Sequence, residues 1–211
     1  VGLGFRISHL DVNISDPPFR FRSARGHVRI IGDTAFAALP HVEMLGSAAH
    51  GGGKAWWGRG RPLAYALHFV GDTVSLDDIA WVYPTLPRTG GGRATIDIHS
   101  QRNPHVIDYR LTNIDVRTTE SRLRGTMMFT VGGSTLAIRD VGIQADPVDF
   151  ALIRTLSGKP FPYDWAGHFT GFVRGPGGPL PRFRTDTVDL TLHDAHVPGA
   201  VSRVAGSGEV N

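Results

Sequence analysis

Residues 122–131, with the sequence RLRGTMMFTV, decide the fold more clearly than any other stretch of the chain. Leu123, Met127, Phe129 and Val131 are apolar and alternate with arginine and threonine. Because successive side chains of a β-strand point to opposite faces, this alternation predicts a strand with one apolar and one polar face.

The same alternation recurs outward from this segment, most clearly in residues 19–31 and 187–193. Weaker alternation predicts further strands at 5–14, 63–70, 73–82, 93–99, 105–116, 134–144, 167–174 and 180–185. Glycine-rich turns are expected at 51–53, 90–92, 132–133 and 175–178. We expect one continuous apolar face or groove, formed by Phe19, Phe21, Val28, Ile30, Leu123, Met127, Phe129, Val131, Leu136, Ile138, Val188, Leu190 and Leu192.

Signals for helix are confined to two places. Asp146 is suited to cap a helix and Pro147 to occupy its first position, so a short helix is predicted at 147–156. A weaker helical pattern lies near 34–46 and is interrupted by Pro40. The predicted class is therefore all-β: an elongated, curved antiparallel sheet or an open sandwich, built of repeated β-units, with one or two short helical inserts.

Parts of the sequence repeat. Residues 71–79 match residues 133–141 in polarity at most positions, and residues 121–126 resemble residues 202–207. Units of this kind stack, because none of them covers its own apolar face alone. The predicted organisation is a first β-lobe at 1–120, including the helical insert near 34–46, and a second at 121–211, including the short helix at 147–156 and the start of a third unit.

Composition excludes several classes of protein. The net charge of +3 over 211 residues is too small and too evenly spread for a nucleic-acid-binding surface. The absence of cysteine rules out disulfides, thiolate metal sites and cysteine nucleophiles. We expect an anchoring helix before Val1 and further β-units after Asn211, because residues 206–211 repeat the opening of a unit without the strand that should pair with it.

No arrangement of side chains in the sequence predicts catalysis. His50 precedes three glycines, but the chain has no G-x-S-x-G nucleophile elbow, and a flexible turn is the favoured interpretation. His193 and His196 fall on opposite faces of a strand, so sharing a metal ion would need a turn between them. Asp77 and Asp78 are adjacent and cannot pair as acid and base. We expect no enzyme activity, no cofactor and no metal site.

Aromatic and arginine residues gather in one segment, which we call the contact patch. Trp56, Trp57 and Tyr65 flank a turn that carries Arg59 and Arg61. Such a patch suits contact with a membrane interface or a protein, and stacking on a sugar or a nucleic-acid base is an alternative. Ordinary packing of tryptophan at the end of a sandwich is the commonest explanation for such a segment.

Two segments resemble AsmA-like and TamB-like proteins of the bacterial envelope. Residues 77–90 (DDIAWVYPTLPRTG) are similar to a passage of the form L-x-P-x-L-P-x-x-G that ends a strand in that family. Residues 161–171 (FPYDWAGHFTG) are similar to a companion passage that follows a short helix. The resemblance extends over most of residues 19–211. It implies a periplasmic, membrane-associated protein whose curved sheet conducts phospholipid along an apolar groove for outer-membrane biogenesis.

A second hypothesis gives the same module a different role. The chain would be an accessory or scaffolding subunit of a larger membrane-protein complex, for example a photosynthetic or respiratory assembly, attached through a partner or an anchor outside this chain. Its core would then be closed, whereas a lipid carrier needs a continuous open groove. Alternation alone favours the closed sandwich, and the resemblance favours the groove. The expected partners are phospholipid or membrane-protein subunits, and not nucleic acid.

Overall fold

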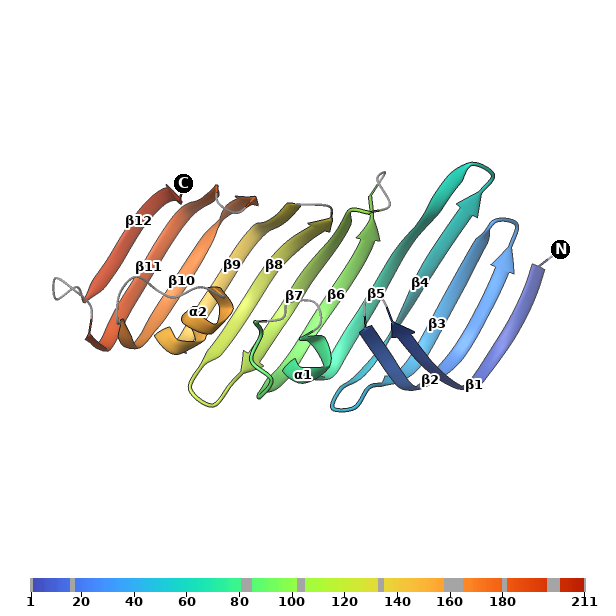
Figure 1. The fold of residues 1–211 in the computed structure, drawn as a ribbon, viewed down its shortest axis with the longest axis horizontal. Coiled ribbons are helices and arrows are strands. Elements are labelled where there is room, and N and C mark those ends of the chain that lie inside the picture. Colours follow the sequence, from blue (N-terminus) through green and yellow to red (C-terminus); the bar gives the residue numbers. More distant parts are fainter. Residues whose placement is uncertain are drawn as a thin grey trace.

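In the computed structural model, the described residues form one antiparallel sheet of twelve strands that lie side by side in chain order (Figure 1). These residues are 2–15, 18–80, 85–101, 105–132, 135–157, 165–179, 182–196 and 202–210. The elements are β1 (Gly2–Ser15), β2 (Pro18–Ile31), β3 (Thr34–Glu43), β4 (Ala48–Gly58), β5 (Arg61–Ser75), α1 (Leu76–Ile79), β6 (Gly91–Ser100), β7 (Ile107–Arg117), β8 (Arg122–Gly132), β9 (Thr135–Asp149), α2 (Phe150–Ser157), β10 (Ala166–Pro179), β11 (Phe183–His196) and β12 (Arg203–Val210). The predicted all-β class, with an elongated curved sheet and short helical inserts, is confirmed.

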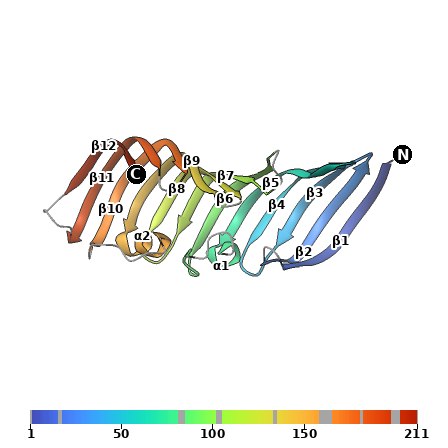
Figure 2. The same cartoon turned by 45° about the horizontal axis from the view of Figure 1, so that its top comes forward.

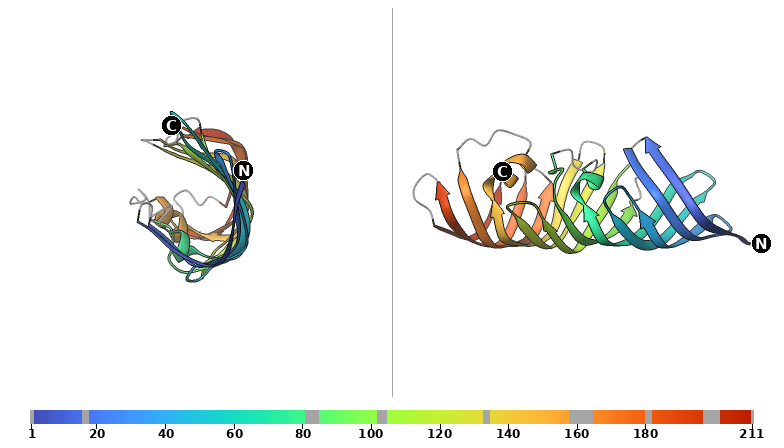
Figure 3. Two further views of the ribbon diagram at one scale, coloured as in Figure 1. Left: turned by 90° about the vertical axis from the view of Figure 1, so that its right-hand side faces the viewer. Right: turned by 90° about the horizontal axis from the view of Figure 1, so that it is seen from below.

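The sheet is curled about its long axis. Seen end-on, it has the outline of an open C, and α1 and α2 lie inside the curve beside one of its lips (Figure 3). The tilted view shows the same curvature along the row of strands (Figure 2). The molecule therefore has a concave and a convex face, and within the described ranges all strands belong to this one sheet.

Bulges bend the odd-numbered strands from β3 to β11. In each of these strands the register with a neighbour shifts, because one extra residue is inserted. At three of the bulges a residue other than glycine adopts the left-handed conformation: Asn113 (φ 53°), Asp140 (φ 49°) and Asp194 (φ 48°). Asn and Asp are enriched in this conformation. Since a bulge bends its strand and increases its twist, bulges in every second strand favour the curl.

Glycines allow the even-numbered strands to bend beside these bulges. A Cβ added at Gly26 in β2, Gly125 in β8 or Gly171 in β10 would lie between 1.9 and 2.0 Å from a carbonyl oxygen of the next strand. Gly125 and Gly171 also have positive φ, at 139° and 133°. A side chain at these positions would push the two backbones apart, so only glycine permits this approach.

Residues 34–46 do not form the predicted helical insert, which is a correction. Most of them form strand β3, which pairs with β2 on one side and with β4 on the other. Pro40, which interrupted the helical pattern, sits where the register of β3 shifts against both neighbours. Proline is tolerated at a bulge, because the ladder needs no N–H group there. Pairing on both sides outweighs the weak helical pattern.

The helix predicted at 147–156 is present, but α2 begins only at Phe150. Asp146 does not cap it, because Arg124 binds the Asp146 carboxylate and residue 146 is still in β9. Asp149 takes the capping role instead, since its Oδ1 accepts a hydrogen bond from the backbone N–H of Ala151. Strand pairing of β9 with β10 therefore displaces the start of the helix.

Two glycine-rich segments predicted as turns lie inside strands. Residues 51–53 are in the middle of β4, and residues 175–178 are in β10. A Cβ at any glycine of 51–53 would lie 2.1 or 2.2 Å from a carbonyl oxygen of β3 or β5, so these glycines allow close approach of the backbones.

The expected boundary between the two lobes, at residues 120 and 121, is not marked by a break in pairing, because β7 and β8 pair across it.

Candidate functional site

One row of apolar residues crosses the middle of the sheet. In an antiparallel sheet, residues directly opposite each other point to the same face. Phe129 in β8 pairs with Tyr109 in β7 and with Ile138 in β9. Tyr109 pairs in turn with Ile98 in β6, and Ile98 pairs with Leu67 in β5. We call these five residues the central row.

A second row continues to the C-terminal edge of the described sheet. Leu123 in β8 pairs with Ala145 in β9, which pairs with Gly171 in β10. Gly171 pairs with Leu190 in β11, and Leu190 pairs with Val204 in β12. Since Leu123 and Phe129 are six positions apart in β8, an even number, both rows lie on one face.

Helix α2 identifies this face as the concave one. The helix lies inside the curve (Figure 3), and its Leu152 packs in a buried cluster with Ala145 and Val148. Leu123 and Phe169 pack against the same cluster. Because Leu123 and Ala145 belong to the second row, the apolar rows line the inside of the curl.

The structure brings most of the predicted apolar residues together on this face. Those that share it are Val28, Ile30, Leu123, Met127, Phe129, Val131, Ile138, Val188, Leu190 and Leu192. The side chains of Phe19 and Phe21 in β2 and of Leu136 in β9 lie outside the described part of the chain. Sequence reasoning missed Leu67 and Ile98, although alternation within the strands predicted at 63–70 and 93–99 would have identified them.

The concave face is open along most of its length. The buried apolar side chains of the described residues are Ala24, Val42, Leu76, Ala80, Ile114, Ala137, Ala145, Val148, Phe150 and Leu152. Several of these belong to the two helices or to the cluster under α2. All five residues of the central row, by contrast, are only partly buried. The interior of a closed sandwich would bury them completely, so the apolar face is accessible to solvent.

The phenol groups on this face stay uncharged at neutral pH. Burial raises the pKa of Tyr65 and of Tyr109 above the usual value, and the neighbouring Tyr65 raises the pKa of Tyr109 further. The backbone N–H of Tyr65 donates a hydrogen bond to Ser100 Oγ at 2.8 Å, which links β5 to β6. The two rows described above contain no ionisable group other than Tyr109, so they offer an apolar surface.

The convex face is polar and is linked across strands by ion pairs. Arg122 in β8 donates two hydrogen bonds to Asp115 in β7, from Nε to Oδ1 at 2.8 Å and from Nη2 to Oδ2 at 2.7 Å. The Arg122 guanidinium lowers the pKa of Asp115 to about 2. Arg203 in β12 binds Asp189 in β11 in the same way, at 2.9 Å for both bonds, and lowers the pKa of that carboxyl.

His193 and His196, the candidate metal ligands, also take part in contacts between strands. His193 Nε2 lies 2.8 Å from the hydroxyl of Thr170, and its ring stacks on that of His168 with 5.3 Å between the centroids. The expectation that His193 and His196 lie on opposite faces is wrong: they pair with His168 and Ala166, which share one face of β10, because the bulge at Asp194 adds one residue to β11. Over the ranges that the structure describes, no three histidine or carboxylate side chains gather at a position that could hold a metal ion.

The structure divides the contact patch between the two faces of the β4–β5 hairpin. Trp56 lies opposite Ala64, on the convex side, and Lys54 Nζ is 5.4 Å from the centre of its ring. Trp57 is the next residue along the strand and points to the concave side. Tyr65 also lies on the concave side, because it pairs with Ala55, two residues before Trp57.

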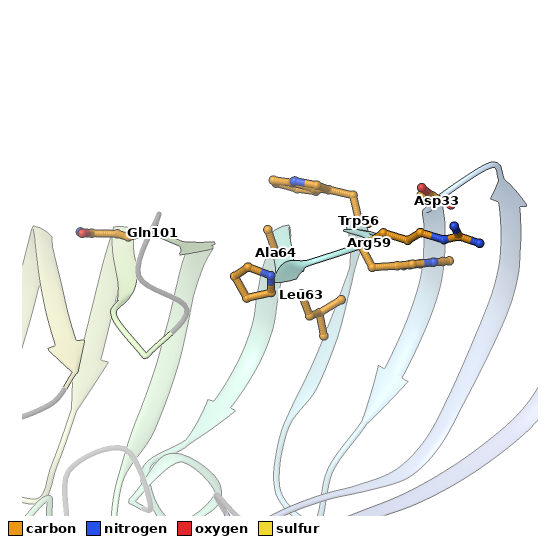
Figure 4. A pocket seen from close by; sticks show the side chains of 9 residues that line it. Asp33, Trp56, Arg59, Leu63, Ala64 and Gln101 are labelled. Atoms are coloured by element: carbon orange, nitrogen blue, oxygen red, sulfur yellow. The ribbon is translucent and has the colours of Figure 1, made fainter.

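An open hollow surrounds the end of this hairpin. Trp56, Trp57, Arg59 and Leu63 line it, together with Asp33 from the neighbouring turn (Figure 4). The side chain of Arg61, which was also predicted for the patch, lies outside the described part of the chain. Leu63, which the sequence reasoning missed, is 55% exposed.

Fold and site together define a class of protein: an open, single-layer, curled antiparallel sheet with an apolar concave face and a charged convex face. The chain matches no protein-family model, no curated protein and no solved structure. Neither helix in the described ranges has the length and apolar character that crossing a bilayer requires. The geometry of the two faces is therefore the basis for assigning a function.

Proposed function

We propose that this chain binds the acyl chains of phospholipids along its concave face and acts without catalysis, as a lipid-conducting module of the AsmA-like and TamB-like type. The observation that carries the proposal is the open apolar face. Its central row crosses from β5 to β9 with every member only partly buried. An apolar surface of this extent that stays accessible to solvent is typical of a binding surface.

The physical basis is transfer of methylene groups out of water. Each methylene buried against the face contributes about 0.8 kcal/mol, so an acyl chain gains affinity in proportion to the length that lies in the curl. The charged headgroup would remain in water at the open side of the C. Because the two rows lack ionised groups, an acyl chain can slide along them without meeting a charge.

Cellular location is part of the same proposal. The resemblance of residues 77–90 and 161–171 to AsmA-like and TamB-like proteins favours a periplasmic, membrane-associated protein of a bacterial envelope. Lipid movement between two membranes needs a surface that shields acyl chains over a distance. An elongated sheet with one continuous apolar face suits that role.

A second candidate function is that of an accessory subunit in a membrane-protein complex. The two edge strands favour it, because β1 and β12 each pair with one neighbour only in the described part of the chain. Leu3 and Phe5 in β1 and Val204 in β12 are 60%, 51% and 47% exposed. A sheet edge of this kind accepts a further strand from another protein. This candidate predicts that the purified chain is stable without lipid and has no affinity for acyl chains.

Two adjacent methionines that point to opposite faces provide the test. Met127→Glu introduces a carboxylate on the concave face, whereas Met128→Glu introduces the same group on the convex face between Arg110 and Arg139. After incubation with phosphatidylethanolamine, native mass spectrometry should detect bound lipid on the wild-type chain and on Met128→Glu. Met127→Glu should retain little lipid, because a carboxylate is costly in an apolar contact.

Folding of both variants is checked by circular dichroism and by the thermal unfolding midpoint. A wild-type chain that binds no phospholipid contradicts the proposal and favours the accessory subunit. So does a folded Met127→Glu variant that binds as much phospholipid as the wild type.

A further inference from the structure

The β4–β5 hairpin presents large apolar side chains at its tip on both of its faces. Trp56 is 38% exposed on the convex side and Trp57 is 40% exposed on the concave side, while Leu63, at the start of β5, is 55% exposed. Packing within a single sheet could account for an indole on one face. It does not account for half-exposed indoles on two opposite faces at the end of the same hairpin.

The position of the hairpin adds to this observation. In the view of Figure 1 its turn reaches beyond the turn between β2 and β3. Trp57, at the base of the tip, is still bonded to that neighbouring turn, because its backbone N–H donates a hydrogen bond to the carbonyl oxygen of Asp33 at 2.9 Å. In the close view, the side chains of Trp56 and Arg59 lie around the hollow, and Arg59 extends toward the neighbouring turn that carries Asp33 (Figure 4). A projecting tip with these side chains can enter the interface of a bilayer while the rest of the sheet stays in water.

Cationic groups accompany the aromatic rings. Lys54 Nζ lies over the ring of Trp56, and Arg59 is exposed in the turn itself. Asp33, in the neighbouring turn, is the acidic residue that lines the hollow. Indole rings favour the boundary between water and the hydrocarbon of a bilayer, where the ring is partly apolar and its N–H stays hydrated. Basic side chains beside them are attracted to anionic headgroups.

We infer that the tip of the β4–β5 hairpin is a bilayer contact, which inserts Trp56, Trp57 and Leu63 into the interface and sets Lys54 and Arg59 against anionic headgroups. The inference goes beyond lipid binding in the concave face, since it concerns how the molecule attaches to a membrane surface. It holds whether or not an individual lipid occupies the central row. A protein partner would use the same side chains without a preference for anionic lipid.

The turn between β3 and β4, at the other end of the strands, offers a control residue. Leu45, in the turn between β3 and β4, is 72% exposed, so its side chain is even more accessible than Trp57. Its surroundings are acidic, because Glu43 precedes it and Asp78 accepts a hydrogen bond from the N–H of Gly46. If exposure of an apolar side chain alone determined vesicle binding, Leu45 would contribute as much to binding as the hairpin tip.

The experiment is flotation of the purified chain with vesicles of phosphatidylcholine and phosphatidylglycerol, compared with vesicles of phosphatidylcholine alone. The wild-type chain should bind the mixed vesicles more strongly, and added salt should weaken that preference. Trp57→Ser should lower binding to both vesicles on the order of tenfold, because a large apolar side chain no longer leaves water. Arg59→Glu, in the exposed turn, should abolish the preference for phosphatidylglycerol, and Leu45→Ser should leave binding unchanged.

A folded wild-type chain that binds neither vesicle overturns the inference and leaves a protein partner for the patch. Equal losses in Leu45→Ser and Trp57→Ser also overturn it, because binding would then follow exposure alone. Circular dichroism shows whether Trp57→Ser is folded, and Arg59→Glu tests the charge independently of the indole. Met127→Glu separates this inference from the proposed function, since it should lose bound phospholipid and still float with mixed vesicles.

Discussion

Among single residues, Asp115 on the convex face accepts two hydrogen bonds from one arginine. Its two carboxylate oxygens each accept a hydrogen bond from Arg122 across the β7–β8 ladder. The geometry is bidentate, which fixes the two side chains more firmly than a single contact would. The pKa of Asp115 is about 2, below its value in an unfolded chain, so the folded state favours the ionised carboxylate.

The low pKa of Asp115 predicts a pH dependence of stability. A carboxyl with a depressed folded-state pKa adds stability that is complete above its unfolded pKa of roughly 4 and is lost as the pH falls further. The thermal midpoints of the wild-type chain and of Asp115→Asn should therefore differ at neutral pH and converge between about pH 4 and pH 2. In an Arg122→Gln background, Asp115→Asn should have a much smaller effect at every pH. A difference that stays constant down to the acid end would contradict the assigned ion pair.

At the scale of the element, the alternation of bulges and glycines determines the curl. Asn113 bulges in β7 where Ile114 pairs with Gly125 of β8, so an extra residue on one strand faces a residue without a side chain on the next. The bulge supplies the bend, and the glycine lets the neighbouring backbone follow it.

Gly125→Ala should therefore destabilise the fold. The new Cβ would lie 1.9 Å from the carbonyl oxygen of Gly142, at a φ of 139° that alanine disfavours. We expect a loss of roughly 2 kcal/mol or more in the free energy of unfolding, measured by urea denaturation. Gly208→Ala in β12 is the control, because no atom lies within 4 Å of the Cβ position there. Equal effects of the two substitutions would be inconsistent with a strained bend at Gly125.

The elements that the sequence predicts well are those with uninterrupted alternation. Residues 122–131 form β8 almost as predicted, because a strand with one polar face needs no further information. The local pattern of residues 34–46 favours helix wrongly, because pairing of β3 with β2 and β4 on its two sides is not visible within that segment. The start of α2 was misplaced for a related reason: Asp146 looks like a cap, but its partner Arg124 is in β8.

For the candidate site, the sequence predicts which residues are apolar but not which of them point to the same face of the sheet. Val28 and Phe129 lie on one face because a chain of residue pairs through β3 to β7 connects them. Each bulge along those strands changes which residues of its strand point to that face, and the local sequence does not reveal where the bulges fall. The tryptophans were predicted as one patch, yet strand geometry sends Trp56 and Trp57 to opposite faces. The direction of the curl depends on all of the bulges together, so no local segment encodes it.

At the scale of the whole molecule, each strand contacts mainly the strands that neighbour it in sequence. The stability of each strand therefore depends on the strands beside it. We predict that amide hydrogen exchange measured by mass spectrometry is fastest in β1 and β12 and slowest in β6 to β9. An edge strand is held on one side only, and local opening at an edge breaks the fewest contacts. Equal protection in all strands would mean that the sheet opens as one cooperative unit.

The pairing of a bulged strand with a glycine-bearing strand also constrains how such a chain can grow or shrink. From β3 to β11 the two kinds of strand alternate, so the smallest change that preserves both chain direction and curvature is a whole hairpin. Each inserted hairpin would add about 10 Å to the length, at about 4.8 Å per strand, and would leave the cross-section untouched. Duplication of a hairpin in the gene would therefore lengthen the sheet, whereas the width of the curl would stay the same. Evolution could fit the length of the sheet to a larger or smaller distance between two membranes by copying or deleting hairpins. The apolar residues of the concave face would not have to change.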